Sequence, residues 1–479
     1  MRVVALCALP ALATLLTLAV PARRVGGWRV VVLVAVAAAH LALAATLWIA
    51  PEAPALDGWL AADALGLVVV SLTSVLFFVT ALYTVGYLRR ENPRGGRLFI
   101  GGLLGFLTAT SVVALSQHLA MLWVGMEATT LAVAPLIFHR HDRHSLEAVW
   151  KYLLLSSVGI ALALLGTFFL ATAQHDVPGS PLLLPDLIAH ARALHPAWLR
   201  AAFLFLLVGF GTKMGLAPMH TWKPDTYGEA PSLVSGLMAG ALTSCAFVGV
   251  ARITQVAMAA GLGPFVQPIL LGFGLLSLGV AAAFIIGQND LKRLLAYSSV
   301  EHMGLLVTGL GIGGAGAYGT VLHLVNNGLT KSWLFLVAGN VVLATGSSAA
   351  SSNRGLVRTL PVSGALLVLG LFAISGSPPF GLFLSELTIL RAAIGAGHPW
   401  VATTILVLLA VIFVGMAQLI LGMSLGAPES GTARARESRW LVFGPVALAG
   451  AVLLLGVYVP GPLQSALARA AVALGGQAP

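Results

Sequence analysis

The sequence predicts an all-α polytopic membrane protein with about 14 transmembrane helices. Two observations carry this prediction. Hydrophobic residues make up 58% of the 479 residues and charged residues only 9%, whereas soluble domains carry about 25% charged residues. Apolar runs long enough to cross a hydrocarbon core of about 30 Å also recur along the whole chain. The composition therefore leaves almost no room for a soluble domain.

The apolar runs give the expected spans in order. They begin near Val3, Val30, Leu60, Phe99, Leu119, Tyr152, Ala201, Leu233, Phe265, Leu294, Tyr318, Leu360, Val401 and Trp440. The first run follows Arg2, as in a signal peptide, but it lacks a small-residue cleavage site, so we expect it to be retained. Residues 174–198 form the one long connection, and within it residues 187–192 predict an interfacial helix.

Basic residues gather in alternate connections between these spans. They are Arg23, Arg24, Arg29, Arg89, Arg90, Arg94, Arg97, His139, Arg140, Arg143, Lys151, Lys292, Arg293, Arg354, Arg358, Arg434, Arg436 and Arg439. The intervening connections are nearly uncharged or acidic, as at Glu52, Asp57 and Asp63. The positive-inside rule then makes the basic connections cytoplasmic and places both termini outside. The net charge of +10 is thus topological and does not indicate nucleic-acid binding.

Two expected spans are interrupted in the middle. The seventh, residues 203–240, breaks near Pro218, is expected to leave the membrane through residues 220–225, and re-enters at residues 229–231. The twelfth, residues 371–386, contains Pro378 and Pro379. The seventh and twelfth spans are five positions apart in the order of spans, so they run through the membrane in opposite directions. A pair of interrupted helices in such positions is typical of inverted-repeat transporters.

This symmetry predicts four parts. Residues 1–98 hold three N-terminal helices, and residues 99–258 form a first inverted repeat of five helices. Residues 259–425 form the second repeat, and residues 426–479 hold a last helix and a short tail.

Lys213 is the first functional candidate, because a lysine within an apolar span costs at least a few kcal/mol. The proline break after it frees a carbonyl that needs protein or water as a partner, so we expect a hydrated pocket. A kinked helix whose lysine reaches the interface is the alternative. Glu127, in the middle of the fifth span, is the expected partner of Lys213, and alternating pairing would switch the proton affinity of the lysine. The alternative for Glu127 is a structural carboxylate bonded to a hydroxyl.

A second set of candidates lies in the second half of the chain. His323, Asn327 and Lys331 are four residues apart and share one helix face, and a histidine that titrates near neutrality suits a proton relay. Glu386 follows the second break and is the expected proton exit. A purely structural role for the histidine is the alternative.

For several other polar residues the sequence leaves the location or the role undecided. Glu301 and His302 are deep in the tenth span, whereas Asp290 and Lys292 at its start are expected at the interface. His220 and Glu229 flank the first break as pocket or cytoplasmic gate residues. The two cysteines are far apart, and neither a dinucleotide fingerprint nor a P-loop is visible, so we expect no cofactor or metal in this chain.

These motifs resemble a known family: the antiporter-like, proton-conducting membrane subunits of respiratory complex I, Mrp-type cation/proton antiporters and membrane-bound hydrogenases. The resemblance covers about residues 60 to 425. Its motifs are Trp123 with Glu127, residues 211–222, 229–237 and 290–299, His323 with Lys331, and residues 377–386. Residues 146–154 and 381–386 are most similar to component F of hydrogenase-4, a nickel–iron hydrogenase assembly.

The resemblance implies a central hydrophilic axis. Glu127 and Lys213 would form its switching ion pair, His323 and Lys331 its relay, and Glu386 its terminal site. Two departures bear on this: Ser244 stands where relatives often have a lysine on the eighth helix, and Asn327 where complex I relatives often have a histidine. Neither side chain can carry a charge, which counts against full pumping. The resemblance also implies a long lateral helix only in distal subunits, and none is expected after Val459.

The expected function is proton translocation, driven by hydrophilic redox subunits such as nickel–iron hydrogenase-like and iron–sulfur proteins that assemble with this chain and other membrane subunits. The rivals are a subunit of a multisubunit Na⁺/H⁺ antiporter and a non-conducting membrane scaffold. The alanine-, valine-, arginine- and glycine-rich usage suggests a prokaryote, so the expected location is the bacterial cytoplasmic membrane.

Overall fold

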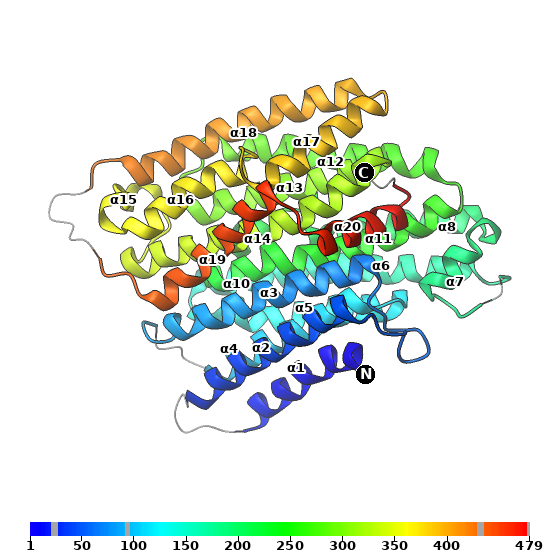
Figure 1. The fold of residues 1–479 in the computed structure, drawn as a ribbon, viewed down its shortest axis with the longest axis horizontal. Helices are drawn as coiled ribbons and strands as arrows, with labels where there is room; N and C mark the ends of the chain where they lie inside the picture. The colour runs from blue at the N-terminus through cyan, green and yellow to red at the C-terminus, as the bar shows by residue number, and fades with distance from the viewer. Residues whose placement is uncertain (21–26, 92–95, 178, 429–434, 477–479) are drawn as a thin grey trace.

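The protein is a helical bundle, as the computed structural model shows for residues 1–20, 27–91, 96–177, 179–428 and 435–476 (Figure 1). No β-strand occurs within these ranges. The first half of the described chain contains α1 (Arg2–Ala19), α2 (Gly27–Ile49), α3 (Ala64–Tyr87), α4 (Gly96–Leu115), α5 (Leu119–Ile137), η1 (Phe138–Arg140), α6 (Arg143–Ala173), α7 (Leu184–Ala189), η2 (Ala191–Ala193), α8 (Pro196–Met214), α9 (Trp222–Glu229), α10 (Ser232–Leu237), η3 (Met238–Leu242) and α11 (Thr243–Ala259). The second half contains α12 (Gly263–Ile285), α13 (Leu291–Ile312), α14 (Ala315–Thr345), η4 (Ala350–Ser352), α15 (Leu356–Thr359), α16 (Pro361–Ile374), α17 (Gly381–Gly395), α18 (Pro399–Leu425), α19 (Arg439–Val457) and α20 (Gly461–Ala473).

Among the described residues, 12 helices are long and apolar enough to cross a membrane, which confirms a polytopic membrane protein. The two other expected spans correspond to α13 and to the broken pair α16 and α17. α13 carries several polar residues, and α16 with 14 residues is too short to cross a bilayer alone. The count of 14 and the division into two repeats stay predictions.

The centre of the bundle is formed by α13, α14 and the continuous segment α10–η3–α11, which are almost entirely buried. α1 and α18 lie at opposite edges of the view (Figure 1). The central helices carry the polar residues while the edge helices are nearly uncharged, the arrangement expected when intramembrane polar groups must face protein.

Both interrupted spans are broken helices, as predicted. α8 ends at Met214 and a glycine in the left-handed region follows, Gly215 with φ of 79°. α16 ends at Ile374, and Gly376 with φ of 63° follows before α17 begins. Glycine is the residue that adopts this backbone without steric cost. Residues 222–229, which include most of the segment expected to leave the membrane, form a helix, α9, which packs on α6 and α13.

The connections expected on one side of the membrane meet at one end of the bundle. Arg90 donates to the carbonyl of Arg436 at 2.8 Å, and Asp225 pairs with Lys151 at 2.7 Å and with Arg293 at 3.2 Å. At the other end the N-terminal ammonium bonds Glu52, and residue 314 pairs with residue 476. The two chain ends therefore share one end of the bundle (Figure 1). Arg23, Arg24, Arg94 and Arg434, used in the topology prediction, lie outside the described residues.

The connections at the ends of the bundle hold one expected helix and one unexpected helix. The long connection contains α7 and η2 over the segment predicted to be helical. The segment after α19, where a short tail was expected, contains another helix: residues 461–473 form α20. This helix packs on α3 and α14, and its buried residues are Ala466, Leu467, Ala470 and Ala471. The small side chains of one face of this helix let it approach its neighbours closely.

Candidate functional site

The first polar cluster surrounds Lys213, in the last turn of α8, whose side chain is fully buried. Its Nζ donates to Thr130 Oγ1 at 2.6 Å and to Tyr152 OH at 2.8 Å. The Thr130 hydroxyl in turn donates to Glu127 Oε2 at 3.1 Å, within α5. No direct ion pair between Lys213 and Glu127 forms in the described part of the chain. Lys213 and Glu127, expected to pair directly, are instead linked by the Thr130 hydroxyl, which accepts a hydrogen bond from the lysine and donates one to the carboxylate.

The local sequence explains this arrangement. Thr130 follows Glu127 by three residues and so lies on the same face of α5. α5 is held against α6 by Trp123, whose Nε1 donates to the carbonyl of Ile160 at 2.7 Å. Glu127 itself is only partly buried, unlike Lys213. The carboxylate therefore lies at the outer end of this cluster and the lysine at its inner end.

A second lysine, Lys223, lies in α9 and is also fully buried. Its Nζ donates to Ser299 Oγ of α13 at 3.1 Å and lies 5.9 Å from the centre of the Tyr227 ring. Trp222, beside it in sequence, packs on Tyr152 with ring centres 5.2 Å apart. α9 therefore connects the cluster around Lys213 with the face of α13.

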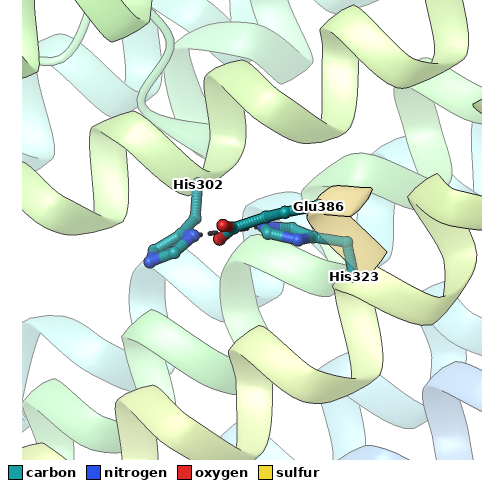
Figure 2. Close-up of side chains that lie close together, drawn as sticks. All are labelled: His302, His323 and Glu386. Atoms are coloured by element: carbon teal, nitrogen blue, oxygen red, sulfur yellow. Dashed lines mark hydrogen bonds between the residues drawn. The ribbon is translucent and has the colours of Figure 1, made fainter. Parts of the chain in front are cut away.

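The third cluster joins α13, α14 and α17 around two histidines. His302 Nδ1 and His323 Nε2 are 3.1 Å apart, and His323 Nδ1 is 3.0 Å from Ser385 Oγ. Figure 2 shows the Glu386 carboxylate beside the two imidazole rings. Within the described residues His302 Nε2 and Glu386 Oε1 have no hydrogen-bond partner. Buried polar atoms bond to protein or water, so this cluster has the free positions that a water-assisted proton path uses.

The same three residues have the chemistry of a cation site. Their ligand atoms lie within 4.8 Å of one another, and imidazole and carboxylate are ligands for zinc. In this structure, however, the facing nitrogens of the two imidazoles lie at hydrogen-bonding distance. The expectation of no metal in this chain stays a prediction.

Lys331 of α14 is also fully buried. Its Nζ donates to the carbonyl of Leu295 in α13 at 3.2 Å, and Glu301 on α13 accepts from Ser298 at 3.1 Å. Asn327, between His323 and Lys331 on the α14 face, is 1% exposed, and neither of its amide atoms has a partner among the described residues. The α14 stripe expected from the sequence thus faces α13 and α17.

Four other candidates lie apart from these contacts. The Ser244 hydroxyl donates to the carbonyl of Gly240 in its own helix at 2.6 Å, and Glu229 is half-buried at the end of α9. His220 is mostly buried against the rings of Phe284 and Tyr297. Lys292, expected at the interface, is covered by protein: it is 1% exposed and donates to the carbonyls of Gly228 and Ala230, the last of these at 2.6 Å.

Sequence reasoning missed Thr130, Tyr152, Lys223 and Ser299. Lys223 stands among polar residues and so resembled part of an exposed connection. The signal that could have found it is the aromatic pair Trp222 and Tyr227 around it, which is unusual for a solvated loop. The hydroxyl residues carried no signal, because serine, threonine and tyrosine are common throughout membrane helices.

Comparison with known proteins places this arrangement in a family. The family model described as "NADH:quinone oxidoreductase/Mrp antiporter, TM" matches residues 116–412. The chain is 33% identical to "Hydrogenase-4 component F homolog" of Methylacidiphilum infernorum, over 83% of this chain and 85% of the relative. It is 26% identical to "Hydrogenase-4 component B" of Escherichia coli over 70% of this chain, but spans only 51% of that longer relative.

Solved structures agree with this. A chain of respiratory complex I from Thermus thermophilus has a TM-score of 0.78 and 26% identity, covering 95% of this chain and 97% of that one. A chain of an archaeal membrane-bound sulfane sulfur reductase has a TM-score of 0.88 at 21% identity, covering 99% and 98%, which shows the shared fold. The matched family model includes all three polar clusters, and the chain belongs to the NADH:quinone oxidoreductase/Mrp antiporter family of transmembrane subunits.

Proposed function

We propose that the chain is a proton-translocating membrane subunit of a redox-driven complex of the hydrogenase or NADH dehydrogenase type. The observation that carries this proposal is the set of buried ionisable residues along the centre of the bundle. Lys213, Lys223, Lys331, His302 and His323 are all fully buried. Membrane helices carry such residues at a cost, and proton and ion pathways are the usual reason for them.

The geometry supports named roles for the two ends of this path. Glu127, partly buried on α5, would exchange protons with the surroundings, and Thr130 would pass them to Lys213. At the other end the His302–His323 pair would deliver protons to Glu386, whose carboxylate lies beside the rings. Lys331 and Glu301 on facing helices would hold the charge between these ends.

The partners belong to the same proposal. The similar proteins are named as a component of hydrogenase-4 and as parts of respiratory complexes. We therefore propose other membrane subunits beside this chain, and hydrophilic hydrogenase-like and iron–sulfur subunits that hold the redox cofactors. The membrane would be the cytoplasmic membrane of a prokaryote, with both termini outside.

A subunit of a multisubunit Na⁺/H⁺ antiporter is the second candidate, because the matching family also includes the Mrp antiporters. In that case proton movement would depend on sodium. Purification of the tagged chain from its native membranes in mild detergent, followed by mass spectrometry, separates the two. Recovery of redox subunits supports the first function, and recovery of small membrane subunits alone supports the antiporter.

The proton path is tested with Lys213→Ala and Glu127→Ala in the complex that contains the chain, reconstituted into vesicles. Each variant should lower proton translocation per complex at least tenfold, or about 1.4 kcal/mol in the rate barrier, because each removes an ionisable group from the path. Glu147→Ala, which changes an exposed carboxylate of α6, is the control. Unchanged proton movement in both test variants would contradict the role assignment.

A further inference from the structure

We infer that Lys223 is the proton carrier that joins the Lys213 cluster to the relay on α13 and α14, an inference that rests on the proposed function. The two ends of the path described above have no direct contact with each other in the described residues. Lys223 is the buried ionisable side chain that α9 places between them. Lys223, on α9 after the first helix break, thus carries the middle step of the path.

The surroundings of Lys223 differ from those of a structural lysine. It is fully buried, it donates to a neutral hydroxyl, Ser299 Oγ, and no carboxylate of the described chain pairs with it. Lys292, equally buried nearby, instead donates to two backbone carbonyls at the end of α9 and so closes that helix. A buried lysine without a counter-charge readily exchanges its proton, whereas one fixed on two carbonyls has a capping role.

On one side, aromatic rings link Lys223 to Lys213. Tyr152 accepts from Lys213 and packs on Trp222, and Trp222 packs on Tyr227 with ring centres 5.9 Å apart. The Tyr227 ring lies beneath Lys223, and its buried hydroxyl has no partner in the described chain. Tyr152 and Tyr227 thus both pack on Trp222, and the hydroxyl of each can accept and donate a hydrogen bond.

On the other side, α13 aligns three contacts on one helix face. Lys331 bonds at residue 295, Lys223 bonds at residue 299, and His323 bonds at residue 302. These residues are four and three apart and so lie on the same face of the helix. At 1.5 Å per residue the first two contacts are about 6 Å apart along the helix, and the last two about 4.5 Å apart. One water molecule, which accepts one hydrogen bond and donates another, spans the shorter of these distances, and two water molecules span the longer one.

The second broken helix has a matching arrangement. A Cβ built on Gly215 would collide with Lys223 Cε, so the lysine side chain crosses the glycine that ends α8. The side chain of Glu386 crosses Gly376, after the end of α16, in the same way. At each break, an ionisable side chain from the helix that follows lies over the glycine that comes after the preceding helix. Lys223 thus lies against Gly215 as Glu386 lies against Gly376.

The test compares four variants of the complex in vesicles, with proton translocation driven by its own redox reaction and measured per assembled complex. Lys223→Met should lower translocation at least tenfold, because the side chain can no longer take up a proton. Lys223→Arg should also fail, because arginine keeps its charge and its hydrogen bond to Ser299 but does not release its proton. Lys292→Met should lower the melting temperature but leave translocation per assembled complex unchanged. Lys213→Ala should abolish translocation.

The outcomes separate this inference from the function on which it rests. Full translocation by Lys223→Met or by Lys223→Arg, with Lys213→Ala inactive, would overturn the role of Lys223 and leave the proposed function standing. Full translocation by Lys213→Ala would overturn the function itself. If Lys223→Met does not assemble, Lys223→His decides the matter: a carrier role requires translocation that depends more steeply on pH near neutrality than in the native complex, and an unchanged pH profile would contradict it.

Discussion

At the scale of single residues, hydroxyl side chains connect the ionisable groups. Thr130 lies between Lys213 and Glu127, Ser299 accepts from Lys223, and Ser385 Oγ lies 3.0 Å from His323 Nδ1. A hydroxyl can accept one hydrogen bond while it donates another, so it passes a proton without holding a charge in the membrane. At Thr130 this links two ionisable residues, Lys213 and Glu127, that are not in direct contact.

Thr130 provides the sharpest test of this idea. Thr130→Val keeps the shape of the side chain but removes the hydroxyl between Lys213 and Glu127. We expect proton translocation per complex to fall about tenfold, since a hydrogen bond to a charged group is worth about 1.5–3 kcal/mol. Thr130→Ser, which restores the hydroxyl, should recover most of the loss.

Thr129→Val is the matched control for that measurement. The Thr129 hydroxyl donates to the carbonyl of Met126 within α5 at 2.6 Å, and among the described residues it makes no hydrogen bond to a member of the path. Native translocation in Thr129→Val together with a loss in Thr130→Val would tie the effect to the bridge. Equal losses in both variants would instead indicate a general disturbance of α5.

At the scale of helices, one ion pair ties the start of α3 to α11 in the centre of the bundle. Arg252 of α11 bonds both carboxylate oxygens of Asp63 at 2.7 Å, and Asp63 also caps the N-terminus of α3. Burial by itself would raise the pKa of Asp63, but the charge of Arg252 and the hydrogen bonds from Arg252, Gln117 and Gly66 outweigh it and lower that pKa. The pair therefore stabilises the native state when the carboxyl is ionised.

Asp63→Asn should destabilise the protein by an amount on the order of 3 kcal/mol at neutral pH, because it leaves Arg252 buried without a counter-charge. A carboxyl whose pKa is lowered on folding stabilises above its unfolded pKa and loses that contribution as the pH falls through its folded pKa. The gap in melting temperature between the native protein and Asp63→Asn, measured in detergent, should therefore narrow in acid. Asp57→Asn, at an exposed carboxylate of the same loop, should melt at the same temperature as the native protein at every pH. A constant gap for Asp63→Asn would contradict the pairing argument.

At the scale of the whole molecule, the basic connections gather at one end of the bundle and both chain ends lie at the other. The positive-inside rule predicts that the basic end is cytoplasmic. We therefore predict that Ala53→Cys, in the loop between α2 and α3, is labelled by an impermeant maleimide on intact cells. Ser352→Cys in η4, at the other end, should be labelled only after the membrane is opened.

This labelling is done in a background with Cys7→Ser and Cys245→Ala, so that each added cysteine is the single thiol. The two added positions are small, exposed residues, which keeps the substitutions from disturbing the bundle. Labelling of Ser352→Cys on intact cells, with Ala53→Cys protected, would invert the proposed orientation.

Much of the candidate site follows from the sequence because ionisable residues are conspicuous in apolar segments. Lys213, His323, Lys331 and Glu386 each stand in a long hydrophobic run, and hydration cost alone marks them. Lys223 escaped because its neighbours His220 and Asp225 resemble a solvated connection. Its burial depends on α6 and α13, which cover α9 and lie far away in the chain.

The sequence by itself determined the class of the protein, the approximate spans and the two breaks, because these depend on local hydropathy and proline. The sides of the connections, which follow from charge, stay a prediction. The tertiary structure decided which polar groups touch: that Thr130 separates Lys213 from Glu127, that Lys292 closes a helix, and that Lys223 reaches α13. The physical reason is that a hydrogen bond requires two groups to lie within about 3 Å. In a helical bundle this depends on how helices distant in sequence rotate and pack against each other.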